Sequence, residues 1–443
     1  MLEGARGGTA ARASLVGLTF VAIASLPALR RDAPDTTPPA AAATAPASVP
    51  ESAEPPILPR RSPIDSAVEA ASYETAARSA YAYLLANRTP TGLVKATEEY
   101  DNVTTWDIGG LILGLHSALE LGMAPREEML AWMHTVLETL NQAPLFDDRA
   151  YNKSYGATNG QMIGSDDKPS SRGKGWSSTD LGRLLIALRV AEQHPELADL
   201  ARSAAQRIDF TRVVREGYLY GEEPRSSGNV SYVEGRVGYE QYAALGFSLW
   251  GHRAESALDV NANSVPVTVM GRSLLADKRG REQLTSEPIV LMGMELGWAP
   301  PFRELAASMI EVQEARYQQT GQVTIVSEDA LPHPPHFFYY YDVWSGGETF
   351  VVRAQGPVGD VPRWVSAKAA YAWHALVPNG YTWRAVTAVE PARSGAGWAS
   401  GIYEGNGRST GVRNLNSAAV ILEAALYRRR GRPLVEAAAG GGS

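Results

Sequence analysis

Helical segments with different amounts of apolar surface alternate along the chain from about residue 66 onward. Segments 104–121, 177–192 and 238–251 are apolar on nearly all sides, whereas 125–141 has a charged face opposite its apolar one. A helix that is apolar all round is normally buried, and one with a polar stripe faces solvent. The pattern therefore predicts buried helices that alternate with half-exposed ones.

Twelve segments follow this alternation. The other buried segments are 286–296, 364–376 and 414–428. The other half-exposed segments are 66–87, 195–207, 252–261, 302–319 and 381–389. Two concentric rings would bury the first set and half-expose the second. We therefore predict an all-α fold, an (α/α)6 toroid of six inner and six outer helices, with short β-hairpins in the loops at one end.

Long polar excursions at 146–175 and 323–363 precede two of the buried segments. Loops of this length are uncommon unless they are functional, and neither an up-and-down bundle nor a superhelical repeat array has them regularly before a buried helix. A strand-like piece at 217–221 indicates short β-structure in another loop. A β-hairpin over 398–403 is the predicted explanation for the glycines at 395, 397 and 401. These excursions should surround the end of the toroid where the inner helices begin.

Each buried segment begins with polar or charged side chains. In a toroid the inner helices all begin at one end, so these side chains should line a common pocket. They are Asp107, Asp180, Glu240, Glu287, Lys368 and Asn416. An acid is also favoured at a helix N-terminus by the helix dipole, so each acid taken alone has a purely structural explanation.

Carboxylates beside aromatic rings are typical of a site for sugar chains. Cleavage of a glycosidic bond needs one carboxyl group that donates a proton and another that activates water or attacks directly. Glu240 has the most apolar surroundings, which favour a protonated acid, so we assign it the donor role. Glu287 is the predicted base or nucleophile, with Asp107 as the competing choice.

Further side chains near these acids are expected to bind the sugar by ring stacking or by hydrogen bonds to hydroxyls. They are Trp106, Asp180, Trp176, Tyr239, Arg172, Glu328, Asp329, Tyr155 and Asn416. Glu328 and Asp329 fit a plain loop turn equally well. The predicted partner is therefore an oligosaccharide or a polysaccharide.

Charge and cysteine content exclude several other functions. A net charge of −7 argues against a nucleic acid or an anionic membrane as partner, because both require a basic surface. The absence of cysteine excludes disulfides, thiolate metal sites and cysteine catalysis. His333 and His336 lack an obvious third ligand, so we expect no metal and no cofactor.

The N-terminal region has the composition of an export signal. Arg6 and Arg12 precede a mostly apolar run at 14–29, and Arg30 and Arg31 follow it. We therefore expect a signal peptide or signal anchor over 1–31, a Pro/Ala-rich disordered tether over 32–63, a catalytic domain over 64–430 and a flexible tail over 431–443. The protein should be exported, at the cell surface or in the periplasm, with tethering to the inner membrane as one option.

Several distinctive motifs follow one another along the chain. They are TTWDIGG (104–110), NKSYGATNGQMI (152–163), GKGWSSTDLGRLL (173–185), YVEGRVGYEQYAA (232–244), SEPIVLMGMELGW (286–298), QEARYQQTG (313–321) and VSEDALPHPPHFFY (326–339). In this order they resemble the bacterial family catalogued as domain of unknown function 3131. The resemblance implies a distant relation to glucoamylase-like (α/α)6 enzymes, including enzymes active on β-1,2-glucan. Their Phe-Glu-Tyr and Ser-Glu-Ser motifs carry important carboxylates. Glu240 and Glu287 occupy the matching positions, although Gln241 and Pro288 depart from the pattern.

The leading hypothesis is a glycoside hydrolase or transglycosidase acting on a bacterial glucan or exopolysaccharide. A noncatalytic glycan-binding or assembly subunit would use the same aromatic cleft. A polysaccharide lyase with Tyr239 or a loop tyrosine as base is a third option.

Overall fold

The computed structural model describes residues 64–279, 283–354 and 361–435. The predicted export signal and tether at 1–63 and residues 436–443 of the predicted tail lie outside these ranges. Within the described ranges, no helix is both long enough and apolar enough to span a bilayer.

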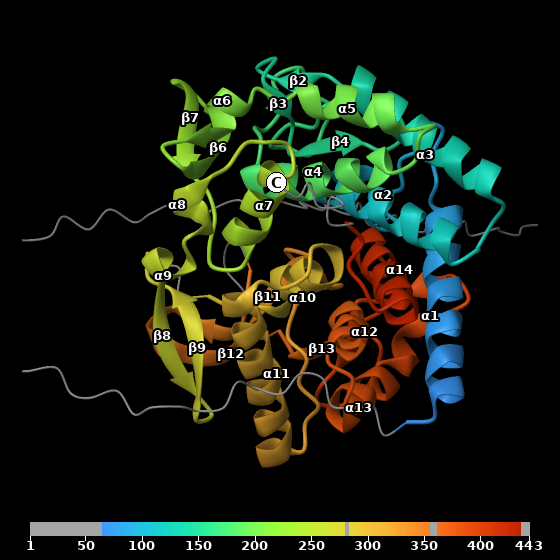
Figure 1. Ribbon diagram of the computed structural model, residues 1–443, viewed down its shortest axis with the longest axis vertical. Helices are drawn as coiled ribbons and strands as arrows, with labels where there is room; N and C mark the ends of the chain where they lie inside the picture. Colours follow the sequence, from blue (N-terminus) through green and yellow to red (C-terminus); the bar gives the residue numbers. More distant parts are fainter. Residues whose placement is uncertain (1–63, 280–282, 355–360, 436–443) are drawn as a thin grey trace, which may run out of the picture.

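All six segments predicted to be buried form helices with largely buried side chains. They are α2 (Thr105–Glu120), α4 (Ser178–Glu192), α7 (Tyr239–Ser248), α10 (Ser286–Glu295), α12 (Ala367–Leu376) and α14 (Leu415–Arg430). Each packs against the next in this order, and α14 packs against α2, so the order of contacts closes on itself. Figure 1 shows these helices grouped in the interior of the molecule.

Five of the predicted half-exposed segments form helices on the outside of this group. They are α1 (Ser66–Ala86), α3 (Arg126–Gln142), α5 (Ala198–Gln206), α11 (Pro300–Thr320) and α13 (Gly380–Ala388). They contact α14, α2, α4, α10 and α12 respectively. In Figure 1, α1 lies alongside α14 although the two helices are at opposite ends of the described chain.

The prediction of one outer helix over 252–261 is wrong. This stretch holds α8 (Glu255–Leu258) and the start of α9 (Val260–Asn263). Asp259 separates them, because its Oδ1 accepts a hydrogen bond from the backbone N–H of Ala262 at 2.9 Å and so caps the second helix. A short helix, α6 (Phe210–Val213), precedes the sheet that follows α5.

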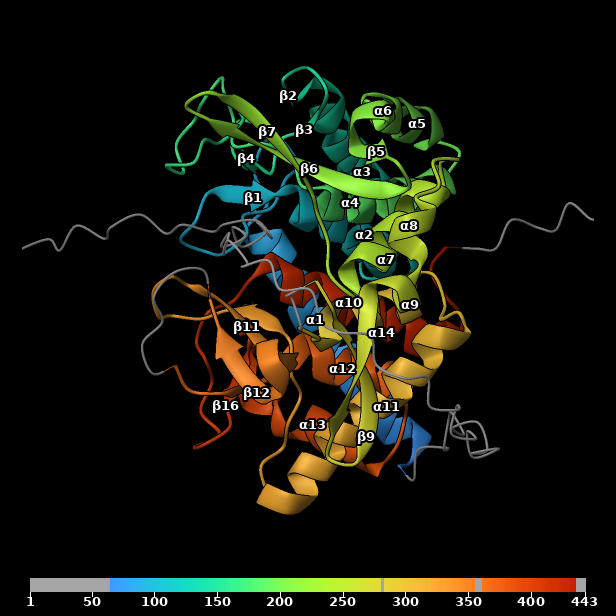
Figure 2. The same cartoon turned by 90° about the vertical axis from the view of Figure 1, so that its left-hand side faces the viewer.

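Small antiparallel sheets occupy the loops. They pair β1 (Asn102–Thr104) with β4 (Ser154–Gly156), β2 (Leu145–Phe146) with β3 (Ala150–Tyr151), β8 (Ser264–Val269) with β9 (Arg272–Asp277), β13 (Trp364–Ser366) with β16 (Gly401–Tyr403), and β14 (Arg393–Ser394) with β15 (Gly397–Trp398). Three strands form each of the sheets β5 (Val214–Arg215), β6 (Tyr218–Arg225), β7 (Gly228–Val233) and β10 (Glu328–Ala330), β11 (Phe337–Trp344), β12 (Glu348–Arg353). Figure 2 shows several of these strands beside the helices.

The strand pairing corrects one predicted hairpin and explains one excursion. Residues 398–403 do not form a hairpin with one another, because Trp398 pairs with Arg393 while Gly401 pairs with Ser366. In the excursion at 323–363, Glu328 lies opposite Tyr339 across the β10–β11 pair. Strand pairing therefore fixes the conformation of much of this excursion next to the inner helices.

Glycines explain how closely the inner helices approach one another. A Cβ on Gly110 would lie 3.3 Å from Arg183 Nη2, and one on Gly114 would lie 3.2 Å from the Cα of Ala419. Because Gly110 and Gly114 have no side chain, α4 can pack closely against α2 at the first position and α14 at the second. The unusual glycines of this segment are consistent with its interior position.

Candidate active site

A pocket lies where the inner helices begin. Five of these helices contribute side chains from their first turns to the pocket walls. The side chains are Trp106 and Asp107 of α2, Asp180 of α4, Glu287 of α10, Lys368 of α12 and Asn416 of α14. Strand β10 adds Glu328 and Asp329, and the remaining lining residues are Ala96, Thr104, Ala330, Phe337 and Asn414. The space between these residues, counted with the open solvent at its mouth, is about 590 Å³. The predicted gathering of helix starts around a hollow is therefore seen for these residues.

Glu287 is the carboxylate with the most partners in the pocket. It accepts hydrogen bonds from Lys368 Nζ and, at 2.7 Å, from Asn416 Nδ2, and Arg183 Nη1 lies 3.8 Å from its Oε1. The side chains of Glu287 and Lys368 are each 2% exposed. The positive charges of Lys368 and Arg183 therefore compensate the negative charge of the buried Glu287 carboxylate.

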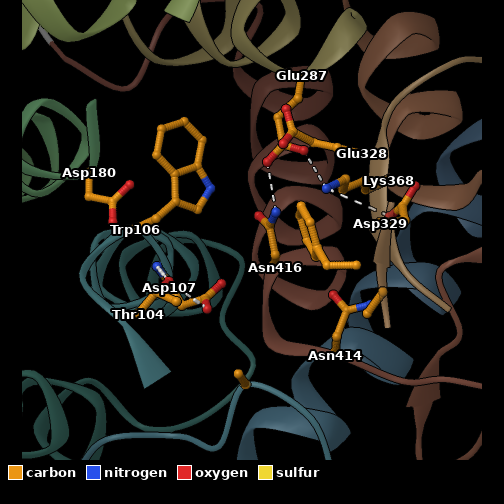
Figure 3. A pocket seen from close by; sticks show the side chains of 13 residues that line it. Thr104, Trp106, Asp107, Asp180, Glu287, Glu328, Asp329, Lys368, Asn414 and Asn416 are labelled. Carbon is orange, nitrogen blue, oxygen red and sulfur yellow. Dashed lines mark hydrogen bonds and ion pairs between the residues drawn. The ribbon is translucent and has the colours of Figure 1, made fainter. Parts of the chain in front are cut away.

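Glu328 and Asp329 lie on the same side of the pocket as Glu287 (Figure 3). Burial raises the pKa of Glu328 to about 7, although Arg236 opposes the shift with a hydrogen bond of 3.3 Å to Oε1. Burial likewise raises the pKa of Asp329 to about 6 against the charge of Lys368, 3.6 Å away. Trp364 Nε1 also donates to Asp329 at 2.8 Å. Carboxyl groups that titrate near neutral pH are suited to acid–base chemistry.

Asp107 and Asp180 form the facing side together with Trp106 (Figure 3). Asp107 accepts a hydrogen bond of 2.7 Å from Thr104 Oγ1, and burial still raises its pKa. Burial, followed by the charge of Glu234, raises the pKa of Asp180 well above its usual range. One wall of the pocket therefore carries Lys368 together with acids, and the facing wall carries Asp107 and Asp180 beside Trp106.

Glu240, the predicted proton donor, is not among the residues that line this pocket. Its carboxylate is fully buried and accepts a hydrogen bond of 2.6 Å from Arg279 Nη2, which also binds Asp277. The start of α7 does touch the start of α10, since a Cβ on Gly238 would lie 3.0 Å from Pro288 Cγ. Glu240 and Glu287 thus belong to neighbouring helix ends, while the Glu240 side chain is held by an arginine.

The aromatic residues predicted to stack on sugar divide into two groups. Trp106 lines the pocket, and the buried ring of Tyr239 lies behind it at 5.7 Å. Trp176 is fully buried with its Nε1 donating to the carbonyl of Tyr220 at 2.9 Å, and Tyr155 is buried with its hydroxyl donating to the carbonyl of Pro144. The last two rings pack in the core, and their polar atoms are satisfied there.

Arg172 also lies outside the pocket lining. Its side chain is bonded to the backbone carbonyl of Arg225 at the tip of the β6–β7 hairpin. The other predicted contacts, Asp180, Glu328, Asp329 and Asn416, are all pocket residues. For Glu328 and Asp329, strand pairing replaces the loop turn that the sequence left open.

Arg183 is a site residue that the sequence interpretation missed. Its fully buried guanidinium lies 4.7 Å above the Trp106 ring and donates at 3.2 Å to Asn416 Oδ1 and to Glu423 Oε1. The available signal was a single arginine within the otherwise apolar run at 181–188. A charge in such a place is rarely tolerated unless it is paired. Arg183 is therefore the second cation beside Glu287, since its Nη1 lies 3.8 Å from Oε1 of that carboxylate.

The chain matches the model of one protein family and is similar in fold to several solved structures. Residues 75–431 match the model of the family described as "Protein of unknown function (DUF3131)". No curated protein matches the chain in sequence.

Solved structures are similar in fold at low identity. A candidate glucoamylase from Bacteroides caccae has a TM-score of 0.60 at 15% identity, covering 82% of this chain and 94% of that one. The endo-β-1,2-glucanase of Chitinophaga pinensis, in complex with sophorotriose and glucose, has a TM-score of 0.60 at 13% identity, covering 82% and 93%. The endo-β-1,2-glucanase of Talaromyces funiculosus, in complex with sophorose, has a TM-score of 0.55 at 11% identity, covering 82% and 84%. At these identities the likeness shows a glycoside hydrolase-like helical fold.

Proposed function

The chain belongs to the DUF3131 family and has a glycoside hydrolase-like fold, and from this premise we propose that it is a glycoside hydrolase or transglycosidase acting on a bacterial glucan or exopolysaccharide. One observation carries the proposal. Glu287, with its charge compensated by Lys368, shares a pocket with carboxyl groups whose pKa values are raised by burial. A charged and a protonated carboxyl group in one hollow are what glycosidic cleavage requires.

The proposed architecture is an (α/α)6 toroid. The closed order of contacts among α2, α4, α7, α10, α12 and α14 supports this arrangement, as does the pocket at their beginnings. The two short helices α8 and α9 take the place of a single outer helix beside α7. Helix starts that converge on one hollow would give the chemistry a rigid frame.

Glu287 is the proposed base. In this role it accepts a proton from the water that attacks the anomeric carbon, while a second carboxyl group protonates the leaving oxygen. Lys368 and Asn416 hold its two oxygens in place from neighbouring helices. Trp106, which lines the pocket, is the proposed contact for the apolar side of a pyranose.

β-1,2-Glucan is the first substrate to test, because two proteins of similar fold are described as endo-β-1,2-glucanases bound to its fragments. The full chain is incubated with a panel of β-1,2-, β-1,3-, β-1,4-, β-1,6- and α-1,4-glucans. New reducing ends indicate hydrolysis, and cyclic or lengthened products in the mass spectrum indicate transglycosylation. Glu287→Gln, which keeps the shape of the side chain, is the matched variant and is expected to release no product.

A noncatalytic glycan-binding or assembly subunit is the second candidate. The buried Glu287–Lys368 pair favours it, because such a pair can also serve only to fix the shape of a binding pocket. Binding to one glucan of the panel without any change in that glucan would support this function and contradict the hydrolase.

Export through residues 1–31 stays a proposal that N-terminal sequencing of the mature protein tests.

A further inference from the structure

Asp180 differs from the other carboxyl groups of the pocket in its hydrogen bonding. Its side chain is 1% exposed and lines the pocket, yet neither carboxyl oxygen has a hydrogen-bond partner among the described residues. Ser177, not Asp180, is the N-cap of this helix, and its hydroxyl accepts a hydrogen bond from the backbone N–H of Asp180 at 3.1 Å. The same hydroxyl opposes the rise that burial causes in the pKa of Asp180. A buried polar group without a partner is costly unless a ligand supplies that partner.

Lys153 and Lys174 act on Asp180 only by their charge, because each is paired with another acid. Lys153 Nζ lies 3.0 Å from Glu223 Oε1, and Lys174 Nζ lies 3.3 Å from Asp167 Oδ1. The buried Glu234, which accepts hydrogen bonds from the backbone and the hydroxyl of Ser178, is another acid close enough to act on Asp180 by charge. Burial, followed by the charges of Glu234 and Asp107, raises the pKa of Asp180 against the opposing charge of Lys153 and so favours its neutral form.

The place of Asp180 in the pocket also matters. Figure 3 shows Asp180 on the opposite side from Glu287, with the indole of Trp106 beside it. Glu328 is on the Glu287 side, and one of its oxygens is occupied by Arg236. Glu240 is held by Arg279 and does not line the pocket. A bond between two sugars lying between the walls would have Asp180 on one side and Glu287 on the other.

We propose that Asp180 is the catalytic proton donor, acting across the pocket from Glu287; this inference rests on the proposed function. The carboxyl proton of Asp180 passes to the glycosidic oxygen as the bond from that oxygen to the anomeric carbon breaks, and the bonding electrons leave with the oxygen. Water forms the new bond to the anomeric carbon and gives a proton to Glu287. Asp180 ends as a carboxylate and Glu287 as an acid, and exchange with solvent restores both.

Substrates with different leaving groups test this role. Asp180→Asn keeps the size of the side chain but has no acidic proton. On β-1,2-glucan it should lower kcat/KM by about 10²- to 10⁴-fold, the usual contribution of general acid catalysis. On 2,4-dinitrophenyl β-sophoroside, whose leaving group needs no proton, it should keep activity within about tenfold of the wild type, in line with a loss confined to proton transfer. Glu287→Gln should lose activity on both substrates.

The pH profile and two matched variants complete the test. In the wild type, kcat/KM on glucan should fall at high pH as Asp180 loses its proton, and this fall should be absent for Asp180→Asn on the dinitrophenyl substrate. Equal losses on both substrates would reduce Asp180 to a binding residue and overturn the proposal. The same would follow if Glu328→Gln or Glu240→Gln, but not Asp180→Asn, showed the leaving-group dependence. A wild-type protein that cleaves no glycan of the panel overturns the proposed function together with this inference.

Discussion

Lys368 donates a hydrogen bond from Nζ to Glu287 Oε2 at a place where both side chains are 2% exposed. The two residues come from the first turns of α12 and α10, which pack against each other. Removing one partner of such a pair leaves a buried charge without compensation, which typically costs about 3–5 kcal/mol. This pair therefore links the stability of the packing between α10 and α12 to the charge in the pocket.

The first prediction separates these two effects. Lys368→Met should lower the free energy of unfolding by about 3 kcal/mol, because Glu287 loses its nearest cation. The double variant with Glu287→Gln should recover part of that loss but no activity. Urea denaturation and the reducing-end assay measure the two properties. Losses of stability that simply add would show that the two side chains are not coupled in the native state.

The second prediction concerns the pH dependence of stability at Glu328. Burial raises the pKa of Glu328 to about 7 from an ordinary value of 4.5. Between these values the native state keeps the proton and the unfolded chain loses it, so this stabilising contribution is full below pH 4.5 and lost as the pH rises to about 7. Glu328→Gln removes the dependence. Its stability relative to the wild type should therefore increase across this range, by about 1.4 kcal/mol for each rise of one in pH.

Thermal unfolding of both proteins from about pH 4 to about pH 8 measures this difference, because the range brackets both protonation states of the carboxyl group. Asp329 titrates in the same direction but is present in both proteins, so it largely cancels. A difference in melting temperature that does not change with pH would mean that Glu328 has the same pKa in the native and unfolded states, and it would contradict the raised pKa.

The third prediction supplies a variant that loses stability without touching the pocket. Glu69 of α1 accepts hydrogen bonds from Arg428 at 2.6 and 2.9 Å and from His374 at 2.9 Å. Burial opposes its charge, but these partners outweigh that effect and lower the pKa of Glu69. Glu69→Gln should cost about 2–3 kcal/mol, since hydrogen bonds between charged groups are lost.

Activity at room temperature should be unchanged in this variant. Glu69 and Arg428 line a separate pocket with Leu121 and Met123, which follow the C-terminal end of α2, whereas the candidate active site lies at the N-terminal ends. The stabilising effect of the Glu69 charge should disappear as the pH falls below 4.5, because a lowered pKa favours the native state only above that value. Loss of glucan cleavage together with an intact fold would connect Glu69 to the active site and contradict this separation.

The fourth prediction tests the contact between two inner helices. A Cβ on Gly182 of α4 would lie 2.4 Å from the Cα of Ala243 in α7 and 2.9 Å from its carbonyl oxygen. Gly182→Ala should therefore push the helices apart and destabilise the protein by about 1–3 kcal/mol, as overpacking does. Gly122→Ala tests a glycine with open space around it and a left-handed backbone, where the loss comes from strain alone. Circular dichroism melts compare the two, and equal stability of Gly182→Ala and the wild type would contradict the close approach.

The helices were predictable because their signal is local. Burial on all sides of 104–121 or 177–192 requires apolar residues at every turn, and this requirement is visible in the sequence without knowledge of any partner. Five of the six polar helix starts line the pocket as expected, since the direction of a helix fixes which end its first residues occupy. The interrupted outer segment at 252–261 was misread because one capping residue, Asp259, redirects a chain whose composition is still helical.

The sequence by itself determined where the buried helices lie and that polar or charged side chains stand at their beginnings. Only the tertiary structure decided which acids share a hollow, that Glu240 is bound to Arg279, and that Asp180 has no hydrogen-bond partner among the described residues. The physical reason is that burial pattern depends on neighbours a few residues apart, whereas the charge state of a carboxyl group depends on donors and cations that arrive from distant parts of the chain. Arg183, Lys368 and Arg236 are such groups, and nothing in the local sequence around an acid says which of them will reach it.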